Sequence, residues 1–131
     1  MDDPGFEAVR KLALTSETIA CGWHGRIEFF GAMHRVFRDQ RISHEGLTAA
    51  LDSFEVHCEN GVFQWLELTD RVRRRVEQVY RSAPATSFLR AADALHLACA
   101  AEHGFEEVYS NDRHFLLAAP LFGLRGINLI G

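Results

Sequence analysis

Two acidic residues of this sequence are singled out by their surroundings: one interrupts an apolar stretch, and the other follows a predicted strand. Asp93 lies in the apolar stretch 91–101, whose only other polar side chain is His96. A helix that is apolar on nearly every face is normally buried, and a buried carboxylate is costly unless it is paired, hydrogen-bonded or bound to a metal ion. Asp112 follows a short predicted strand, 106–110, and ligands of open parallel sheets bind beyond the carboxyl ends of the strands. Both acids are therefore candidates for a functional site.

A third acid, Glu28, lies between apolar residues on a helix that follows another short predicted strand. Acids on separate elements can converge only when the chain folds. Hard divalent ions such as Mg²⁺ and Mn²⁺ require several oxygen ligands of this kind. Bound ions can lower the pKa of an attacking water and stabilise a leaving oxygen, which is the chemistry of phosphodiester cleavage.

Each acid also has an alternative role that needs no metal. Basic side chains lie within one or two helical turns of the helical acids: Arg26 and Arg35 near Glu28, and Arg90 and His96 near Asp93. Asp112 is in addition a suitable N-cap for the helix predicted to follow it. The residues alone leave these alternatives open.

The spacing of Asp93 and His96 suggests a zinc pair, because the two lie one helical turn apart. Zinc sites combine such pairs with further cysteine or histidine ligands, and none falls at the usual spacing in this sequence. We therefore interpret His96 as a core histidine with a hydrogen-bond partner, and favour an oxygen-rich site for a hard ion.

The elements that must position these acids alternate along the chain. Helices are predicted over 2–14, 23–39, 44–59, 70–82, 91–101 and 113–119, and strands over 18–21, 62–68, 106–110 and 126–130. Short strands alternating with helices favour an α/β sandwich around a mainly parallel sheet. The chain has 131 residues, of which 47% are hydrophobic and 24% charged, as in an ordinary globular domain.

Two segments of the chain match a known family in order and spacing. The run LRAADALHLACAAEHG followed by VYSNDRHF, together with the upstream GRIEFFGAMHR, resembles PIN-domain proteins, especially the VapC-type toxins of prokaryotic toxin–antitoxin pairs. The resemblance implies a three-layer α/β/α sandwich with a central, mainly parallel sheet. It also implies that Glu28, Asp93 and Asp112 are catalytic acids that bind Mg²⁺ or Mn²⁺.

Further expectations come with this resemblance. The function would be endoribonuclease cleavage of RNA, inhibited by a small VapB-like antitoxin, and the protein would be a homodimer. Ser110 matches the small hydroxyl residue that precedes the last acid of the family, where it could orient a ligand or water. Arg35 is the candidate for a contact with the substrate backbone.

One part of the family pattern has no counterpart here. PIN domains open with an apolar strand that ends in Asp-x-Ser/Thr, and no stretch of this sequence matches it. We therefore expect residues 1–131 to form a single PIN-like domain that is N-terminally incomplete, lacks the usual first strand and is weakly active. Two other functions are considered: a catalytically impaired relic that binds a protein partner, and a different metal-dependent phosphoesterase.

The composition of the sequence limits where in the cell the protein is expected and which partners it is expected to bind. No apolar run reaches the roughly 18 residues needed to span a bilayer, and no signal peptide is visible. The three cysteines are far apart and read as buried thiols of a reducing compartment, so we expect a cytoplasmic protein without membrane contact. The formal net charge is −4, and an arginine cluster over 71–81 is interpreted mainly as a solvated helix face.

Overall fold

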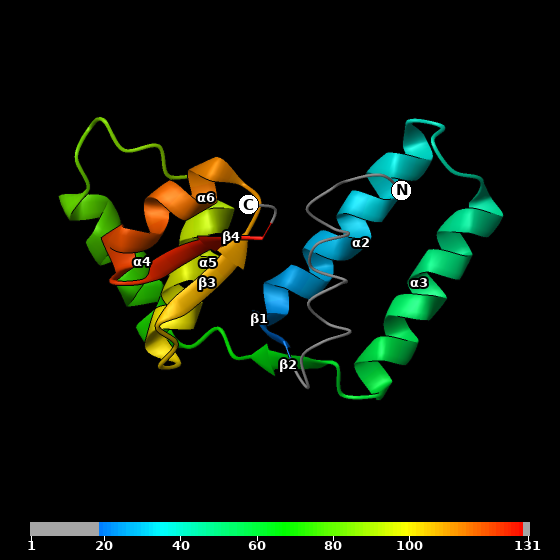
Figure 1. Cartoon of the computed structure of the whole chain (residues 1–131), viewed down its shortest axis with the longest axis horizontal. Coiled ribbons are helices and arrows are strands. Elements are labelled where there is room, and N and C mark those ends of the chain that lie inside the picture. The colour runs from blue at the N-terminus through cyan, green and yellow to red at the C-terminus, as the bar shows by residue number, and fades with distance from the viewer. Residues whose placement is uncertain (1–18, 130–131) are drawn as a thin grey trace.

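The computed structural model describes residues 19–129, in which helices alternate with short strands (Figure 1). The strands are β1 (Ile19–Gly22), β2 (Phe63–Leu66), β3 (Glu107–Ser110) and β4 (Arg125–Asn128). The helices are α2 (Trp23–Arg38), α3 (His44–Glu59), α4 (Asp70–Ser82), α5 (Ala91–Glu102) and α6 (Arg113–Ala118), followed by a 3₁₀ turn, η1 (Ala119–Phe122). The predicted elements in this range are confirmed, with ends shifted by one or two residues. The helix predicted over 2–14 lies outside the described residues.

The strands of the described residues form two separate parallel pairs. β1 pairs with β2 in the register Ala20↔Gln64, and β3 pairs with β4 in the register Tyr109↔Ile127. The expected α/β class with parallel strands is confirmed. The single central sheet is divided here, because no ladder of hydrogen bonds joins β1 to β3 within residues 19–129. α5 links the two pairs instead, since it packs against β1 on one side and against α6 and η1 on the other.

Short polar side chains fix the starts of three helices. Ser43 Oγ accepts a 3.0 Å hydrogen bond from the backbone N–H of Gly46 at the start of α3. Thr69 Oγ1 accepts one of 3.3 Å from Val72 at the start of α4. Such N-caps satisfy backbone donors that have no partner inside the helix. The predicted cap at Thr69 is confirmed, and Asp112 caps α6 in the same way.

The main core lies around α5. Four of its side chains, Ala94, Leu97, Ala98 and Cys99, are buried. Residues from β2, α4, α6, η1 and the turn before β4 complete the cluster: Leu66, Val72, Val79, Ala118, Ala119, Phe122 and Leu124. The nearly continuous apolar character of this helix is therefore explained by contacts with α4, α6, β1 and η1. Asp93 lies at the edge of this core, with its side chain 17% exposed, so the expectation of a fully buried carboxylate is corrected.

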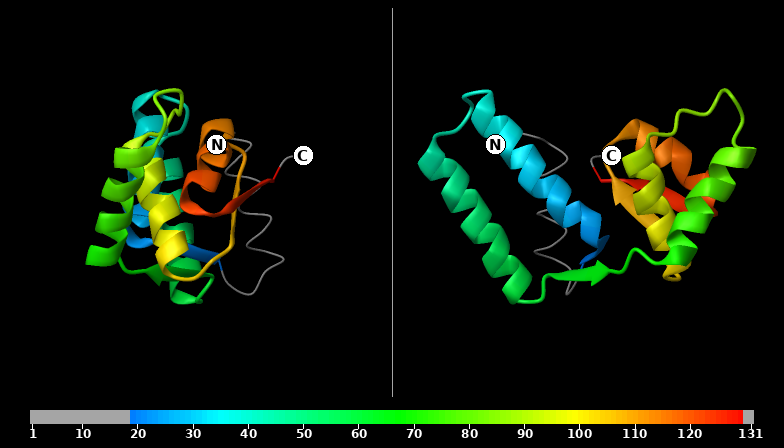
Figure 2. Two further views of the ribbon diagram at one scale, coloured as in Figure 1. Left: turned by 90° about the vertical axis from the view of Figure 1, so that its left-hand side faces the viewer. Right: turned by 180° about the vertical axis from the view of Figure 1, so that it is seen from behind.

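An aromatic cluster holds α2 and α3 to the first strand pair. The rings of Phe29 and Phe54 stack with centroids 4.1 Å apart, and Phe54 also contacts Phe63 and Trp65 of β2. Figures 1 and 2 show that the α2–α3 hairpin diverges from α4, α5 and α6, with β1 and β2 at the base between the two halves. Within residues 19–129, no helix is both long and apolar enough to cross a membrane.

Candidate active site

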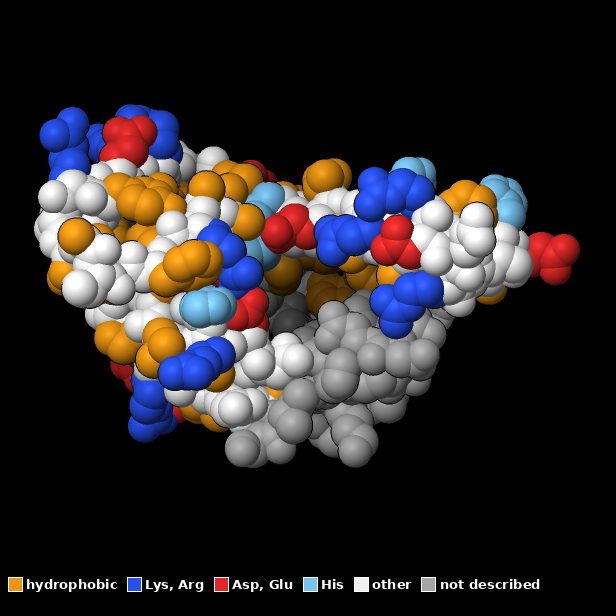
Figure 3. All heavy atoms as spheres, turned by 90° about the horizontal axis from the view of Figure 1, so that it is seen from above, with side chains coloured by type: hydrophobic (Ala, Val, Ile, Leu, Met, Phe, Trp, Pro, Cys, Tyr) orange, Lys and Arg blue, Asp and Glu red, His pale blue; other side chains and the backbone are white. Residues whose placement is uncertain are grey.

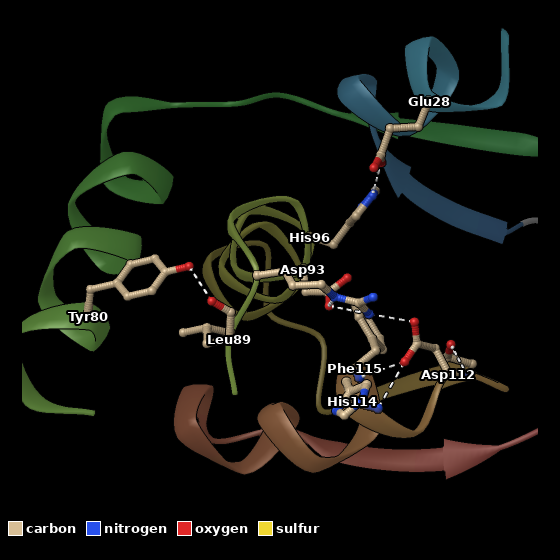
Figure 4. Close-up of polar contacts among 10 residues, drawn as sticks. Glu28, Tyr80, Leu89, Asp93, His96, Asp112, His114 and Phe115 are labelled. Carbon is tan, nitrogen blue, oxygen red and sulfur yellow. Dashed lines mark hydrogen bonds and ion pairs between the residues drawn. The ribbon is translucent and has the colours of Figure 1, made fainter. Parts of the chain in front are cut away.

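The carboxylates of Asp93 and Asp112 both bind the guanidinium group of Arg90, although the two residues are 19 positions apart in the sequence. Arg90 Nε donates to Asp93 Oδ2 at 2.7 Å, and Arg90 Nη2 donates to Asp112 Oδ2 at 2.5 Å (Figure 4). Arg90 precedes α5, Asp93 lies in its first turn, and Asp112 stands just beyond β3. The fold thus brings two of the predicted acids together at the carboxyl end of a strand, around one positive charge.

The backbone after β3 holds the Asp112 carboxylate in place. Asp112 Oδ1 accepts hydrogen bonds from the backbone N–H groups of His114 and Phe115, which begin α6. Ser110 Oγ accepts a 2.9 Å hydrogen bond from the backbone N–H of Asp112, so it shapes this turn. Partial burial acts to raise the pKa of Asp112, but the Arg90 hydrogen bond and the two backbone hydrogen bonds outweigh it and hold the pKa below its ordinary value. Asp112 is therefore an ionised cap with a second oxygen that faces Arg90.

Glu28 reaches the same region through a different contact. Its carboxylate accepts a hydrogen bond from His96 Nε2, which lies one turn beyond Asp93 on α5. This hydrogen bond is the main cause that lowers the pKa of Glu28. In Figure 4, Asp93 and His96 leave α5 toward the same side, with Asp112 at one end of the row and Glu28 at the other. The alternative partners Arg26 and Arg35 do not make this contact; the Arg26 guanidinium lies over the Phe54 and Trp65 rings.

A histidine that the sequence did not single out completes the Glu28 end of the site. The His24 and His96 rings have centroids 3.8 Å apart. Both ring nitrogens of His24 are shielded from solvent and have no hydrogen-bond partner among the described residues. Burial, with a smaller effect from His96, lowers the pKa of His24 to about 4. An unpaired buried polar group costs about 1–3 kcal/mol, so these nitrogens would be stabilised by a ligand.

The remaining predicted site residues take different places. Arg35 is exposed on α2, two turns beyond Glu28, which is about 10 Å along a helix axis. Ser110 lies in the turn with Asp112, as described above. Neither of two surface hollows contains a predicted site acid. One, of about 570 Å³, lies at the α2–α3 connection, and the other, of about 290 Å³, lies between α4 and the start of α5.

Sequence reasoning missed two features of this site. Arg90 was considered as a neighbour of Asp93, but its reach to Asp112 depends on how β3 packs beside α5. His24 was not considered, although its spacing of four residues from Glu28 places both on one face of a helix. That spacing was the available signal. The pairing with His96 could not be found from it, because α2 and α5 are distant in the chain.

Acidic, basic and histidine side chains gather where the two halves of the molecule meet (Figure 3). In α/β folds with parallel strands, ligands bind beyond the carboxyl ends of the strands, which is where Asp112 lies. The family model of the PIN domain matches residues 2–119, and the chain belongs to the PIN-domain family. PIN domains are nuclease-type proteins that generally depend on divalent metal ions. Searches of curated proteins and of solved structures each returned no match.

Proposed function

We propose that this PIN domain is a metal-dependent endoribonuclease of the VapC toxin type. The observation that carries the proposal is the convergence of Asp93 and Asp112, from two different elements, on the guanidinium of Arg90. A place where two carboxylates already share a positive charge suits a divalent cation by both charge and donor chemistry. Asp93 and Asp112 would hold Mg²⁺ or Mn²⁺, and Glu28 is proposed as the third acid.

Bound metal would supply an activated water and charge stabilisation for the leaving oxygen. The chain's own residues hold and orient the reacting groups. The backbone N–H groups of His114 and Phe115 hold the Asp112 carboxylate, and Ser110 accepts a hydrogen bond from the Asp112 backbone N–H. When a cation takes over its two carboxylates, Arg90 is free to bind a phosphate with its planar, bidentate group of N–H donors. Arg35 is proposed as a more distant contact for the RNA backbone.

An exposed aromatic side chain beside the acids supports RNA as the substrate. The Phe88 side chain is 57% exposed. Its ring lies 4.4 Å from the His114 ring, and the Arg90 guanidinium carbon is 5.8 Å from the centroid of the Phe88 ring. Unpaired bases of RNA stack on such aromatic and guanidinium surfaces. A single-stranded segment could therefore place a base on Phe88 and a phosphate near Arg90.

Partners and location belong to the same proposal. Residues 1–131 would act as one domain in the cytoplasm, as a homodimer controlled by a small VapB-like antitoxin. Ile27 and Leu117 are apolar side chains exposed by 72% and 65%, respectively. Ile27 is adjacent to Glu28 in sequence, so an apolar partner segment that covers α2 would lie near the proposed site.

A second candidate is a PIN-fold module that binds a protein without catalysis. The observation that favours it is the pairing of the acids: Arg90 already neutralises Asp93 and Asp112, and His96 already binds Glu28. A site whose charges are balanced by the protein itself need not bind a metal. The two candidates differ in whether divalent ions displace these contacts.

Cleavage of single-stranded RNA by the purified 131-residue chain separates the two candidates. Fluorescently labelled RNA is incubated with Mn²⁺, with Mg²⁺, or with a chelator, and cleavage is followed by gel electrophoresis. The nuclease proposal predicts slow cleavage in either metal that the chelator abolishes and that Asp93→Asn and Asp112→Asn reduce at least about 100-fold. Asp70→Asn, a change in an exposed aspartate of α4, is the matched control and should retain cleavage. Absence of metal-dependent cleavage would favour the binding module.

A further inference from the structure

Three side chains at the Glu28 end of the site have a chemistry different from that of the acid pair. His24, Glu28 and His96 each offer one ligand atom, and these atoms all lie within 4.8 Å of one another. His24 and Glu28 are four residues apart on α2, so they lie on one face of that helix. His96 approaches them from α5, which fixes the third position independently of α2.

The His24 ring is the observation that points to a ligand. Neither of its nitrogens has a hydrogen-bond partner within the described part of the chain, and neither reaches solvent. A buried imidazole usually donates from one nitrogen and accepts at the other. His24 does neither, although Glu28 and His96 are beside it.

Two glycines allow the rings to approach this closely. A Cβ atom on Gly22 would lie 2.6 Å from His24 Cε1 and 2.7 Å from His24 Nδ1. A Cβ atom on Gly25 would clash with Cys21 Sγ and lie 3.2 Å from His96 Cε1. The absence of a Cβ at these two positions therefore leaves room for the two imidazoles at the start of α2.

We propose that His24, Glu28 and His96 form a binding site for one Zn²⁺ ion, separate from the oxygen-rich pair of Asp93 and Asp112. Two imidazole nitrogens with one carboxylate oxygen form a donor set that suits zinc, whereas Mg²⁺ prefers oxygen ligands and retains several waters. With three protein ligands, a fourth position stays open to water. Zinc binding would replace the His96–Glu28 hydrogen bond by a metal bond to each partner and would give one of the two His24 ring nitrogens a partner.

Zinc binding at this site does not depend on the proposed nuclease activity. Glu28 is nevertheless common to both proposed sites, so an ion held by the two histidines would draw Glu28 away from the acid pair. The nuclease proposal and the zinc proposal are tested by different variants, so either can be wrong without the other. Loss of cleavage in the Asp93 and Asp112 variants tests the nuclease, whereas the histidine variants test the zinc site by binding alone.

The test is a competition titration of the metal-free chain with Zn²⁺ against a chromophoric zinc chelator. The unmodified protein should bind one Zn²⁺ per chain. His24→Asn and His96→Asn should each lower the affinity by at least about 10- to 100-fold, the loss seen even when an outer partner of a metal ligand is removed. His34→Asn changes an exposed histidine of the same helix and should leave the affinity unchanged. Circular dichroism of each variant shows that it is folded.

A Co²⁺ titration supplies an independent readout. Co²⁺ in a four-coordinate site with two histidine ligands absorbs visible light much more strongly than the hexaaqua ion does, and His24→Asn should abolish this strong absorption while His34→Asn preserves it. The proposal is overturned if the folded protein binds no stoichiometric Zn²⁺. It is also overturned if His24→Asn binds as tightly as the unmodified chain, or if Asp93→Asn and Asp112→Asn weaken binding as much as the histidine variants do.

Discussion

Arg90 is the residue on which the acid pair depends when no metal ion is bound. It is the shared partner of Asp93 and Asp112, and these two contacts raise the pKa of its guanidinium. Without a cation, two carboxylates this close would repel each other and one would tend to take up a proton. The hydrogen bond from Arg90, together with the backbone hydrogen bonds from His114 and Phe115, instead holds the pKa of Asp112 below its ordinary value. Under the nuclease proposal, Arg90 balances the negative charge of the two acids, and a divalent ion would compete with it for their carboxylates.

Replacing Arg90 by Gln should expose this competition. The variant loses a pair of half-exposed ionic contacts, so we expect its free energy of unfolding to fall by about 1 kcal/mol without metal. Mn²⁺ should then raise its melting temperature more than that of the unmodified protein, because the ion no longer displaces a cation. Arg81→Gln, which changes an exposed arginine of α4, is the control. Equal Mn²⁺-induced shifts in the Arg90 variant and the unmodified chain would contradict this role.

Asp112 should make the free energy of unfolding depend on pH in the acidic range. Because its folded pKa lies below the ordinary value of about 3.9, the ionised form stabilises the fold above that pH, and this contribution is lost as pH falls through the folded pKa. Asp112→Asn keeps a side chain that can cap α6 but removes the charge. The variant should be less stable by under about 1 kcal/mol at pH 6, because the side chain is partly exposed.

The difference between the two proteins should shrink as the pH falls below about 3.9 toward the folded pKa of Asp112. Denaturant unfolding at a series of pH values from 3 to 7 would measure it. A constant difference at all pH values would show that Asp112 acts through its cap hydrogen bonds alone.

At the scale of elements, the Glu28 end of the site forms only where the start of α2 lies close to α5, because Glu28 comes from α2 and His96 from α5. Gly25 lies at that contact, and a methyl group there meets Cys21 and His96. Gly31, on the same helix, has open space around its Cβ position. The two glycines therefore offer a matched comparison between a packed and an open position of α2.

Gly25→Ala and Gly31→Ala should have opposite effects on stability. Overpacking at Gly25 costs about 1–3 kcal/mol, which outweighs the gain of up to about 1 kcal/mol in helix propensity. At Gly31 only the gain remains, about 0.5–1 kcal/mol. Thermal or denaturant unfolding of both variants measures the difference. Stabilisation by Gly25→Ala would mean that the start of α2 does not pack this closely on Cys21 of β1 and His96 of α5.

The elements themselves were predictable because each carries a local signal. The apolar stretch around Asp93 predicted a core helix, and Thr69 marked the start of α4. The division of the strands into two parallel pairs was not predictable. Strand pairing depends on which segments lie side by side in space, and the sequence pattern of β1 or β3 says nothing of its neighbour. The resemblance to a family with one central sheet led to the expectation of continuity.

The site was predictable to a similar extent. Asp93 and Asp112 could be singled out because one interrupts an apolar helix and the other follows a strand. Their common contact with Arg90 and the approach of His24 to His96 are products of tertiary packing. The spacing of residues along the sequence does not indicate contacts between elements that are distant in the chain.

At the scale of the whole molecule, charge limits how RNA can be held. The formal net charge is −4. Most arginines of the predicted cluster on α4 are engaged by carboxylates, since Asp70 and Glu77 bind Arg73, and Glu102 lies beside Arg71 and Arg75. A broad basic surface of the kind that attracts nucleic acid by itself is therefore not formed by this helix. Under the nuclease proposal, a divalent ion at the acid pair must provide much of the attraction for phosphate.

The most direct test of the central claim is the binding of Mn²⁺ to the acid pair, measured from the electron paramagnetic resonance signal of the free ion. The free signal should fall when the 131-residue chain is added. Asp93→Asn and Asp112→Asn should each weaken this binding by at least about tenfold, because charge count sets the affinity of hard-ion sites. Asp70→Asn and His34→Asn should bind as the unmodified chain does. If Mn²⁺ binds equally well to the Asp93 and Asp112 variants, or to none of these proteins, the acid pair is not a metal site and the proposed mechanism is wrong.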